Sequence, residues 1–389
     1  MGITGLIEEL GSTVVRDTTL DQLGLSGKKV GIDAMIWLVA VKELLIKKEP
    51  RVTLLPREER ERIQADRFMA YCERMFELLK KRNIKYMLVF DGNATPRKTE
   101  IQLLKKKIQE GRCDSDGDEK VNYDKPKSMF IPDRERVRKW FIKEDVEFIV
   151  APYEADAQLT YLAIKGKIDA VITEDTDLIP FGCPRVIFKL DADTLTCQDY
   201  AFNRLKYHKK YRTFIQKMLL EMCIIIGCDY LPNLEGTGKS RASDAVLKRP
   251  SYIDLIPYYE NPLKLRIGAE KYETCKEVIL KEFQKAIKAY TYQQVYDPDS
   301  HTCERLSHMD LKYNLLREDA DKILGPCLKD EAVHIIATGI KSSEIEKTYI
   351  VENTSDKRAG AKRKPSPFIT GHFKRLDDSI DGKRRNRES

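Results

Sequence analysis

The sequence predicts an α/β fold in which a mostly parallel central sheet is flanked by helices. Four short apolar runs rich in β-branched residues support this prediction, at 28–33, 84–91, 146–151 and 169–173. Helical patterns separate these runs, and that alternation is typical of a parallel sheet covered on both faces. The chain has 389 residues, 42% of them hydrophobic, so it can bury a sizeable core.

Composition shifts divide the chain into one large expected domain, 1–350, and a tail. The polar insertion begins with the basic, helix-like RKTEIQLLKKKIQEG and is expected to be a mobile surface element. Lys, Arg, Ser, Pro and Gly dominate the tail, which predicts disorder. The expected parts are an N-terminal region (1–98), the insertion (99–140), an internal region (141–245) with two helices around a Gly-rich turn at about 213–247, a helical C-terminal part (246–350) and the tail (351–389).

The cysteines and histidines exclude several kinds of site. The nine cysteines are scattered and include no C-x-x-C pair, so we expect reduced thiols. The five histidines are dispersed as well, and neither a zinc finger nor an H-E-x-x-H site can be assembled from them. Any catalytic metal is therefore expected to have oxygen ligands. No apolar run is long enough to predict a membrane span.

The net charge of +7 is concentrated in the tail. From 355 to 389 there are eleven Lys and Arg against five Asp and Glu, which gives +6 and leaves residues 1–354 close to neutral. The overall charge is therefore weak evidence for a nucleic-acid partner, and the positions of individual charges are more informative.

Acidic residues follow the predicted strands one after another. In open α/β sheets, functional groups gather at the carboxyl ends of the strands, so we expect these acids to converge. Like charges at short range raise one another's pKa and require a cation, and ligands that are all oxygen select Mg²⁺ or Mn²⁺. Two such ions about 4 Å apart could clamp a phosphodiester for in-line displacement. For any one acid, a helix cap or a solvated loop is the alternative. The acids are Asp33, Asp91, Glu154, Asp156, Asp175 and Asp177, with Asp229 between the two later helices.

The motifs APYEADAQL, ITEDTDLIPFGCPRVIFK, IIGCDYL and MGITGL resemble those of the XPG-like superfamily of structure-specific 5′ nucleases, which includes flap endonucleases and exonuclease 1. EADAQ, GCDY, VIFK and YQQVYDP are most similar to the exonuclease 1 branch. The resemblance covers roughly residues 1–300. It implies a PIN-like 5′ nuclease fold with a helical arch, a nuclease domain at 1–350, and two Mg²⁺ ions, replaceable by Mn²⁺, held by the seven acids as catalytic groups.

Two lysines at the start of the insertion lie seven residues apart, so a helix would place Lys98 and Lys105 on one face. An exposed basic helix is commonly only soluble surface. In the superfamily, however, two basic side chains of the arch reach the scissile phosphate. The resemblance therefore implies catalytic and DNA-binding roles for both lysines, and a DNA contact for Gly2 in the first motif.

The run EGTGKS at 235–240 is similar to a P-loop but lacks its first glycine, because Asn233 stands at that position. It also follows a helical run instead of a strand. The pattern favours two helices whose glycine-rich turn lets backbone amides approach a DNA phosphate. An ordinary helical hairpin is the alternative.

By resemblance, this element is a helix-two-turn-helix that grips duplex DNA and holds K⁺. The expected DNA contacts are Gly236, Gly238, Lys239 and Arg241. The potassium site is less secure, because Ile226 and Asn233 replace the hydroxyl residues that the family often has. A second departure is Val39, which stands where the family usually has an aromatic residue or His that stacks on a nucleotide.

The expected function is 5′→3′ exonuclease activity on double-stranded DNA with nicks, gaps, 5′ ends or 5′ flaps, in mismatch repair or end resection. A dedicated flap endonuclease and an inactive DNA-binding scaffold are the alternatives. The tail clusters KRAGAKRK and KRRNR are typical of nuclear localisation, and PSPFITGHF at 365–373 could dock a mismatch-repair or sliding-clamp partner. We expect a nuclear monomer that does not bind membranes.

Overall fold

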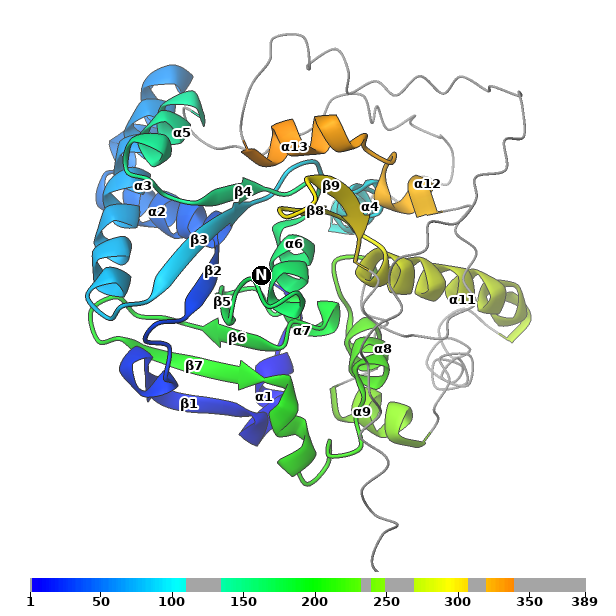
Figure 1. The fold of residues 1–389 in the computed structure, drawn as a ribbon. Coiled ribbons are helices and arrows are strands. Elements are labelled where there is room, and N and C mark those ends of the chain that lie inside the picture. The colour runs from blue at the N-terminus through cyan, green and yellow to red at the C-terminus, as the bar shows by residue number, and fades with distance from the viewer. Residues whose placement is uncertain (1, 110–133, 232–238, 249–268, 307–319, 339–389) are drawn as a thin grey trace, which may run out of the picture. The chain divides into compact units, whose positions relative to one another are not determined.

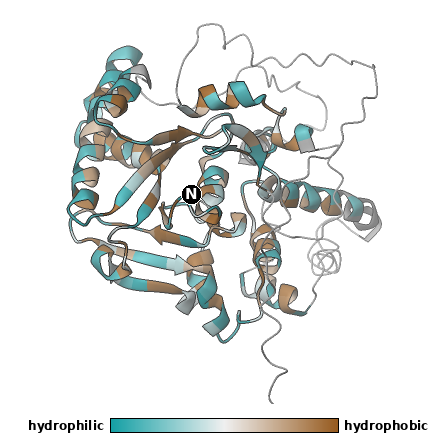
Figure 2. Ribbon diagram, in the orientation of Figure 1, coloured by the Kyte–Doolittle hydropathy of each residue, from teal (hydrophilic) through white to brown (hydrophobic). Residues whose placement is uncertain are grey.

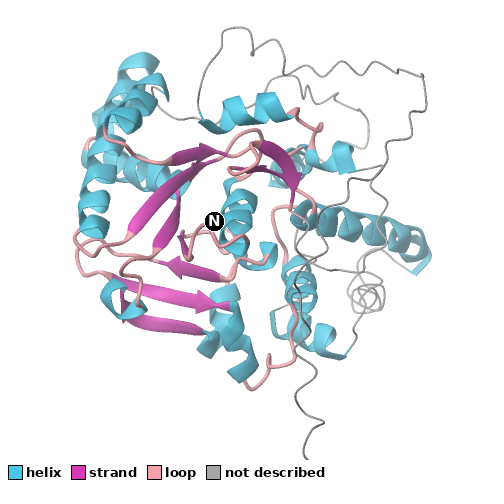
Figure 3. Ribbon diagram, viewed as in Figure 1, coloured by secondary structure: helices cyan, strands magenta, loops and turns pink. Residues whose placement is uncertain are grey.

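The computed structural model describes residues 2–109, 134–231, 239–248, 269–306 and 320–338. The chain divides into two units, Met1–Ile350 and Val351–Ser389, and the second lies wholly outside the described residues. The first unit is built on a seven-stranded sheet with helices packed against it (Figures 1 and 3). Within the described residues, no helix is both long enough and apolar enough to cross a membrane.

The four predicted runs form the parallel centre of the sheet, as expected. Neighbouring strands in the order β1-β7-β6-β5-β2-β3-β4 are hydrogen-bonded, and the pairs among β6, β5, β2, β3 and β4 are all parallel. The strands are β1 (Val14–Thr19), β2 (Lys29–Asp33), β3 (Lys85–Phe90), β4 (Phe148–Val150), β5 (Ala170–Ile172), β6 (Arg185–Phe188) and β7 (Thr196–Ala201).

The strands β1, β6 and β7 were not predicted; β6 is parallel to β5, whereas β1 and β7 are antiparallel to their neighbours. Half of the residues of β1 are exposed, because it forms one edge of the sheet. A strand in that position has no continuous apolar run in its sequence. The prediction of a mostly parallel sheet is therefore confirmed, with an antiparallel extension on one side.

Helices cover both faces of the sheet. On one side lie α2 and α3, and on the other α6, α7 and α8. Figure 2 shows that the long helices α3 and α11 mix hydrophobic and hydrophilic residues, as expected for helices with one solvent-facing side. The helices are α1 (Leu6–Leu10), α2 (Ala34–Lys48), α3 (Arg57–Lys80), α4 (Pro96–Gln109), α5 (Arg134–Lys143), α6 (Ala155–Ile164), α7 (Leu178–Phe181), α8 (Gln216–Ile226), α9 (Lys239–Lys248), α11 (Ala269–Thr291), α12 (Ala320–Leu324) and α13 (Asp330–Thr338), with 3₁₀ turns at η1 (Gly11–Thr13), η2 (Leu20–Leu23), η3 (Pro50–Leu54) and η4 (Phe202–Tyr207).

Alternation along β3 shows how the two faces are filled. Met87 and Val89 join the core that contains α6 and α8, whereas Leu88 and Phe90 join the core that contains α2 and α3. Successive side chains of a strand point to opposite faces, so one strand supplies both cores. All four are buried, which explains why β3 appears in the sequence as a continuous apolar run.

Gly31 in the middle of β2 lets α6 approach the sheet closely. A Cβ atom at this position would lie 2.7 Å from Leu159 Cδ2 and 2.6 Å from Ile168 Cδ1. Such distances leave no room for a side chain. This close packing places the first turn of α6 beside the ends of β2 and β3.

A separate hairpin of β8 (Gln294–Asp297) and β9 (Thr302–Arg305) packs against α6 and α13. The amide of Gln158 in α6 donates to Tyr296 O at 2.8 Å, and Tyr296 N donates back to Gln158 Oε1 at 2.7 Å. This buried exchange fixes the start of the hairpin next to the helix that begins with Glu154.

The predicted insertion and the predicted helix pair are each described in part. The insertion begins in α4, but residues 110–133 lie outside the described residues. The helices of the pair are α8 and α9, and the turn at 232–238 between them also lies outside the described residues.

Candidate active site

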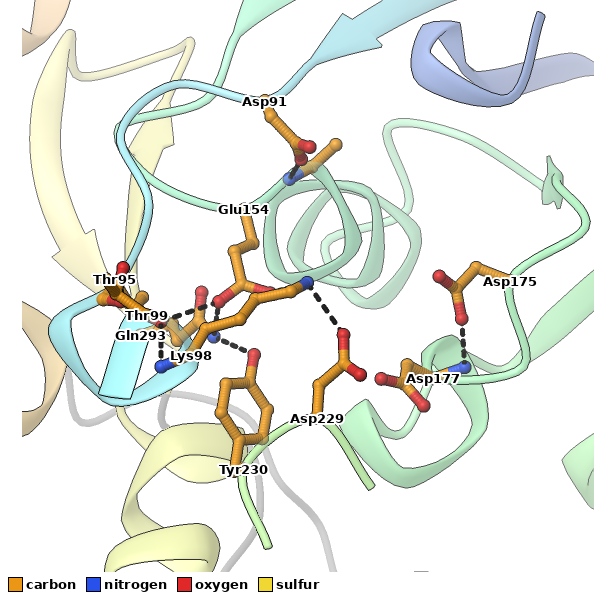
Figure 4. Close-up of polar contacts among 11 residues, drawn as sticks. Asp91, Thr95, Lys98, Thr99, Glu154, Asp175, Asp177, Asp229, Tyr230 and Gln293 are labelled. Atoms are coloured by element: carbon orange, nitrogen blue, oxygen red, sulfur yellow. Dashed lines mark hydrogen bonds and ion pairs between the residues drawn. The ribbon is translucent and has the colours of Figure 1, made fainter. Parts of the chain in front are cut away.

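Six acidic side chains gather where the parallel strands end. Each follows one of the strands β2 to β5, and α6 and α7 hold their backbones in place. A seventh acid, Asp229, follows α8 and lies on the same side (Figure 4). The six are Asp33, Asp91, Glu154, Asp156, Asp175 and Asp177.

Several of these acids also cap local structure. Asp33 accepts from Met35 N at 2.9 Å, at the start of α2. Asp91 accepts from Ala155 N at 2.7 Å, at the start of α6, and Asp175 accepts from Asp177 N at 2.9 Å. Helix capping, the simpler interpretation of a single acid, is therefore real here. It fixes one oxygen of each of these carboxylates and sets its direction.

Burial makes this cluster electrostatically unfavourable. Burial, and then the carboxylates of Asp91 and Asp175, raise the pKa of Asp33 to about 7. Burial followed by the charge of Asp175 also raises the pKa values of Asp156 and Asp177 well above the ordinary range. The charged form of each group is disfavoured by desolvation and by its neighbours, so the site favours the approach of positive charge.

Lys98 supplies positive charge from within the protein. Its Nζ lies 2.9 Å from Glu154 Oε2 and 3.1 Å from Asp229 Oδ2, and its side chain is 23% exposed (Figure 4). Burial alone would lower the pKa of Lys98, but these two carboxylates hold it well above its ordinary value. Lys98 is therefore an ammonium enclosed by acids, and it is not a solvated residue of a basic helix.

Within the described residues, no three Asp, Glu, His or Cys side chains are already arranged so that they could hold one metal ion. The carboxylates are instead engaged by hydrogen bonds and by the Lys98 ion pairs. Thr173 Oγ1 donates to Asp33 Oδ2 at 3.1 Å, and Lys98 lies between Glu154 and Asp229. One acceptor is left over, because Asp177 Oδ1 is buried without a hydrogen-bond partner.

Three polar residues that the sequence analysis missed surround Glu154. Thr95 Oγ1 donates to Glu154 Oε1 at 2.9 Å, and Gln293 Nε2 donates to the same oxygen at 3.2 Å. Gln293 Nε2 also lies 2.6 Å from the hydroxyl of Tyr230. Together they orient Glu154 toward Lys98. Gln293 belongs to the YQQVYDP motif, so its position in a quoted motif was the one available signal.

Arg97 is a fourth residue that the sequence analysis missed, and it is 1% exposed. Its Nε donates to Tyr230 O at 2.9 Å, and its guanidinium pairs with Glu282 of α11 at 2.6 Å. Arg97 thus joins the start of α4 to α11 and to the segment after Asp229. Arg97 also pairs with Glu100, three positions away. Its burial is nevertheless not evident from sequence, because Tyr230 and Glu282 lie 133 and 185 positions away.

Two glycines allow backbone to approach the acids. A Cβ at Gly92 would lie 2.0 Å from Ala151 O, so the residue after Asp91 cannot carry a side chain. Gly2 has a φ of +88°, and its Cβ would lie 2.5 Å from Asp175 Oδ1 and 2.4 Å from Thr176 Oγ1. Ile3 N donates to Thr176 Oγ1 at 2.7 Å, which fixes this contact. Gly2, expected as a DNA contact, therefore lies directly against the acidic cluster.

The structure describes some of the remaining predicted residues and leaves others out. Lys239 begins α9, and its ammonium occupies the space beside Gly5, whereas Arg241 is exposed on the same helix. Lys105 belongs to α4, but its side chain lies outside what the structure describes. Gly236 and Gly238 lie outside the described residues. At the position of the expected stacking residue, Val39 is exposed.

Comparison with known proteins is consistent with this geometry. The model of the XPG N-terminal domain matches residues 1–111, and the model of the XPG I-region matches residues 145–229. The catalytic core of Rad2 in complex with a DNA substrate has the same fold, with a TM-score of 0.55 at 18% identity over 74% of this chain and 86% of that chain. The predicted 5′ nuclease fold is therefore confirmed.

Exonuclease 1 of Oryza sativa subsp. japonica is 32% identical over 354 residues, which are 87% of this chain and 39% of that protein. Exonuclease 1 of Arabidopsis thaliana is 31% identical over 373 residues, which are 92% of this chain and 47% of that protein. The chain thus spans less than half the length of these relatives. The resemblance inferred from the motifs is confirmed: the chain belongs to the XPG family and, within it, is similar to the exonuclease 1 proteins.

Proposed function

We propose that this chain is a metal-dependent 5′→3′ exonuclease on double-stranded DNA that also cleaves 5′ flaps. Its expected substrates are nicks, gaps, 5′ ends and flaps. The observation that supports this function best is the set of buried carboxylates at one edge of the sheet, together with the ammonium of Lys98 that they enclose. An acidic site of this kind suits the hydrolysis of a phosphodiester, whose transition state gains negative charge.

The donor set fits two Mg²⁺ ions. Every candidate ligand is a carboxylate oxygen, which Mg²⁺ and Mn²⁺ prefer. Among the described residues Asp177 Oδ1 has no hydrogen-bond partner, and burial together with neighbouring carboxylates raises the pKa values of Asp33, Asp156 and Asp177, an effect that a bound cation would offset. We propose that the seven acids hold the ions, with Lys98 moving away from Glu154 and Asp229 as they bind. The proposed ligands are Asp33, Asp91, Glu154, Asp156, Asp175, Asp177 and Asp229.

The protein's own groups have separate roles in this reaction. The bound ions would activate a water molecule and stabilise the leaving oxygen. Lys98 would then be free to place its charge beside the scissile phosphate, with Lys105 further along α4. Thr95 and Gln293 hold Glu154, so the ligand keeps its orientation when the ammonium leaves. Gly2 keeps the backbone close to Asp175 without filling the space that a substrate needs.

The duplex would be gripped away from the acids, by α9 and the turn before it. Lys239 and Arg241 at the start of α9 would contact phosphates, together with the backbone at Gly236 and Gly238. Potassium is a weaker proposal for this turn, because Ile226 is apolar and buried and offers only its carbonyl.

Two labelled substrates test the proposed activity. With Mg²⁺ and a nicked duplex labelled at the 5′ end of the nick, an exonuclease releases mononucleotides or very short products first. The same duplex labelled at the 3′ end should give a ladder of gradually shortened strands. Release of an intact flap without subsequent shortening would indicate a dedicated flap endonuclease. Binding without any product would indicate an inactive scaffold.

The cellular setting is proposed from the tail and the relatives. The basic clusters at 357–364 and 383–387 would direct the protein to the nucleus, where mismatch repair or end resection would use it. The segment 365–373 would dock a repair or sliding-clamp partner, and the nuclease itself would act as a monomer. Ending the chain near Glu352 should lower nuclear accumulation in cells while cleavage by the purified protein continues. A folded but inactive truncated protein would show that the tail belongs to the nuclease.

A further inference from the structure

The turn between β7 and α8 carries a concentration of positive charge. From 200 to 220 the sequence has six Lys and Arg and no Asp or Glu, in a chain whose first 354 residues are nearly neutral. The charges gather in KYHKKYR at 206–212, in the green segment that leads to α8 in Figure 1. Nothing in the proposed nuclease chemistry uses this segment.

The cations of this region fall into two groups. Arg204 pairs with Asp199, Lys217 pairs with Glu221 at 3.9 Å, and Lys210 pairs with Glu9 at 3.2 Å and with Asp244 at 3.3 Å. These pairs are structural, because those of Arg204 and Lys210 join the turn to the rest of the protein and that of Lys217 lies within α8.

The other group consists of Lys206, Lys209 and Arg212, three residues apart, and all three are exposed. Among the residues that the structure describes, no acid pairs with any of them. Tyr207 lies between them in sequence, is 80% exposed, and has the Lys206 ammonium 4.8 Å from its ring centroid. The turn thus presents three cations and one aromatic ring to solvent.

The conformation of the turn is held from within. His208 Nδ1 accepts from Lys210 N at 3.1 Å and from Tyr211 N at 3.2 Å, and its ring stacks on that of Tyr211. The Tyr211 hydroxyl donates to Glu9 of α1. A surface that is already ordered loses little conformational entropy when it binds, so the exposed cations are preorganised.

The same network fixes the turn beside α9. Lys210 Nζ lies 2.6 Å from Ser243 Oγ, one turn after Lys239, and Ser243 Oγ donates to Glu9 Oε1 at 3.1 Å. A duplex held at the start of α9 would therefore have the 206–212 turn beside it. Exposed cations next to a phosphate contact extend the charge that a DNA backbone meets.

We propose that the 206–212 turn is a second phosphate-binding surface for duplex DNA, formed by Lys206, Lys209 and Arg212. This inference rests on the proposed function, because it assumes that α9 contacts the duplex. The ligand is the duplex backbone, since a single exposed ring is less than the row of stacked aromatic residues that single-strand surfaces use. The turn widens the grip without touching the catalytic acids.

Binding titrations test this surface without requiring cleavage. The triple variant Lys206→Ala/Lys209→Ala/Arg212→Ala is compared with Lys80→Ala/Lys81→Ala/Lys85→Ala, which removes three exposed cations near the opposite, amino-terminal end of β3. Duplex affinity is measured in EDTA at several salt concentrations. The first variant should reduce the slope of log K against log salt by about 2 to 3 and weaken binding about tenfold or more at low salt, whereas the control should change neither.

Equal losses in the two triple variants would show only a non-specific charge effect and would overturn the proposal. An unchanged salt slope in the Lys206/Lys209/Arg212 variant would also overturn the proposal. So would a Tyr207→Ala variant that loses affinity for single-stranded DNA alone. Because cleavage is not the measurement, failure of the nuclease assay leaves this comparison intact. If the protein cleaves DNA but the triple variant of the turn binds duplex normally, the proposed function stands and only the proposal of this surface is overturned.

Discussion

The two ends of the central sheet have opposite charge patterns. At the amino-terminal end of the strands, two surface lysines each pair with an acid: Lys29 pairs with Glu147 at 2.6 Å, and Lys28 pairs with Asp169 at 3.3 Å. At the carboxyl end, five buried acids and the partly buried Asp91 gather around Lys98. Surface pairs of the first kind contribute about 0–1 kcal/mol each. The unpaired carboxylates at the carboxyl end lower the stability of the fold. Such an arrangement is expected where a cation and a substrate will bind.

The largest expected effect comes from removing an acid at the carboxyl end of the strands. Asp175→Ala or Asp177→Ala should reduce cleavage to background while duplex binding survives, because the proposed metal ligands and the proposed grip are separate. Asp169→Ala, at the amino-terminal end, should leave both unchanged. The measurement is the single-turnover cleavage rate at saturating Mg²⁺ together with duplex affinity. Substantial cleavage by either active-site variant would count against the proposed ligand set.

The enclosed lysine should give the next largest effect. Lys98→Ala should slow single-turnover cleavage by roughly 10² to 10³, the usual loss when one preorganised electrostatic contact is removed. Duplex affinity should stay within a few-fold, and Lys98→Arg should rescue only partly because a planar guanidinium places charge differently. Lys29→Ala is the matched control. Lost affinity and salt dependence with normal cleavage would make Lys98 an ordinary DNA contact.

A buried cation should matter more for stability than a surface cation. Arg97→Met removes the hydrogen bond to Tyr230 O and the ion pair with Glu282, and should lower the free energy of unfolding by about 2 to 4 kcal/mol. Arg82→Ala, which breaks a surface pair with Asp21, should cost less than about 1 kcal/mol. Urea denaturation of both variants provides the comparison. Equal losses would mean that Arg97 does not lock α4 to α11.

Mg²⁺ should produce the smallest effect, a rise in the unfolding midpoint on the order of 2 °C at several times its dissociation constant. Burial and the neighbouring carboxylates raise the pKa of Asp33 to about 7 and also raise the pKa values of Asp156 and Asp177, and any protons on these acids must leave before the ion binds. The rise should therefore increase from pH 6 to pH 8. Differential scanning fluorimetry would show it, and Asp175→Ala should reduce it. A rise that is independent of pH would separate ion binding from these carboxylates.

The sequence predicts the acids at the carboxyl end of the sheet better than it predicts the partners of these acids. The central strands and the acids after them follow from local patterns, because Asp33 and Asp91 end apolar runs and the other four acids follow a run within five residues. The partners of these acids come from elsewhere: Gln293 reaches Glu154 across 139 positions. Only the folded chain brings such pairs together, so no spacing rule could reveal them.

The antiparallel extension shows a second limit. β1 and β7 alternate buried and exposed residues irregularly, and β1 contains a register shift between Val15 and Thr18. Their pairing is a tertiary outcome, and the period of apolar residues does not encode it. Lys98 illustrates the same point at the site, since its helix has the composition of a solvated surface although its ammonium lies among carboxylates.

The fit of Gly2 against Asp175 has a practical consequence for handling this protein. Residue 2 has no room for a side chain and lies against Asp175, at the proposed catalytic edge, so any affinity tag fused ahead of it would begin there. Extra residues left by protease removal of such a tag would compete with substrate and could be mistaken for low intrinsic activity. Purification tags are therefore better attached to the opposite terminus.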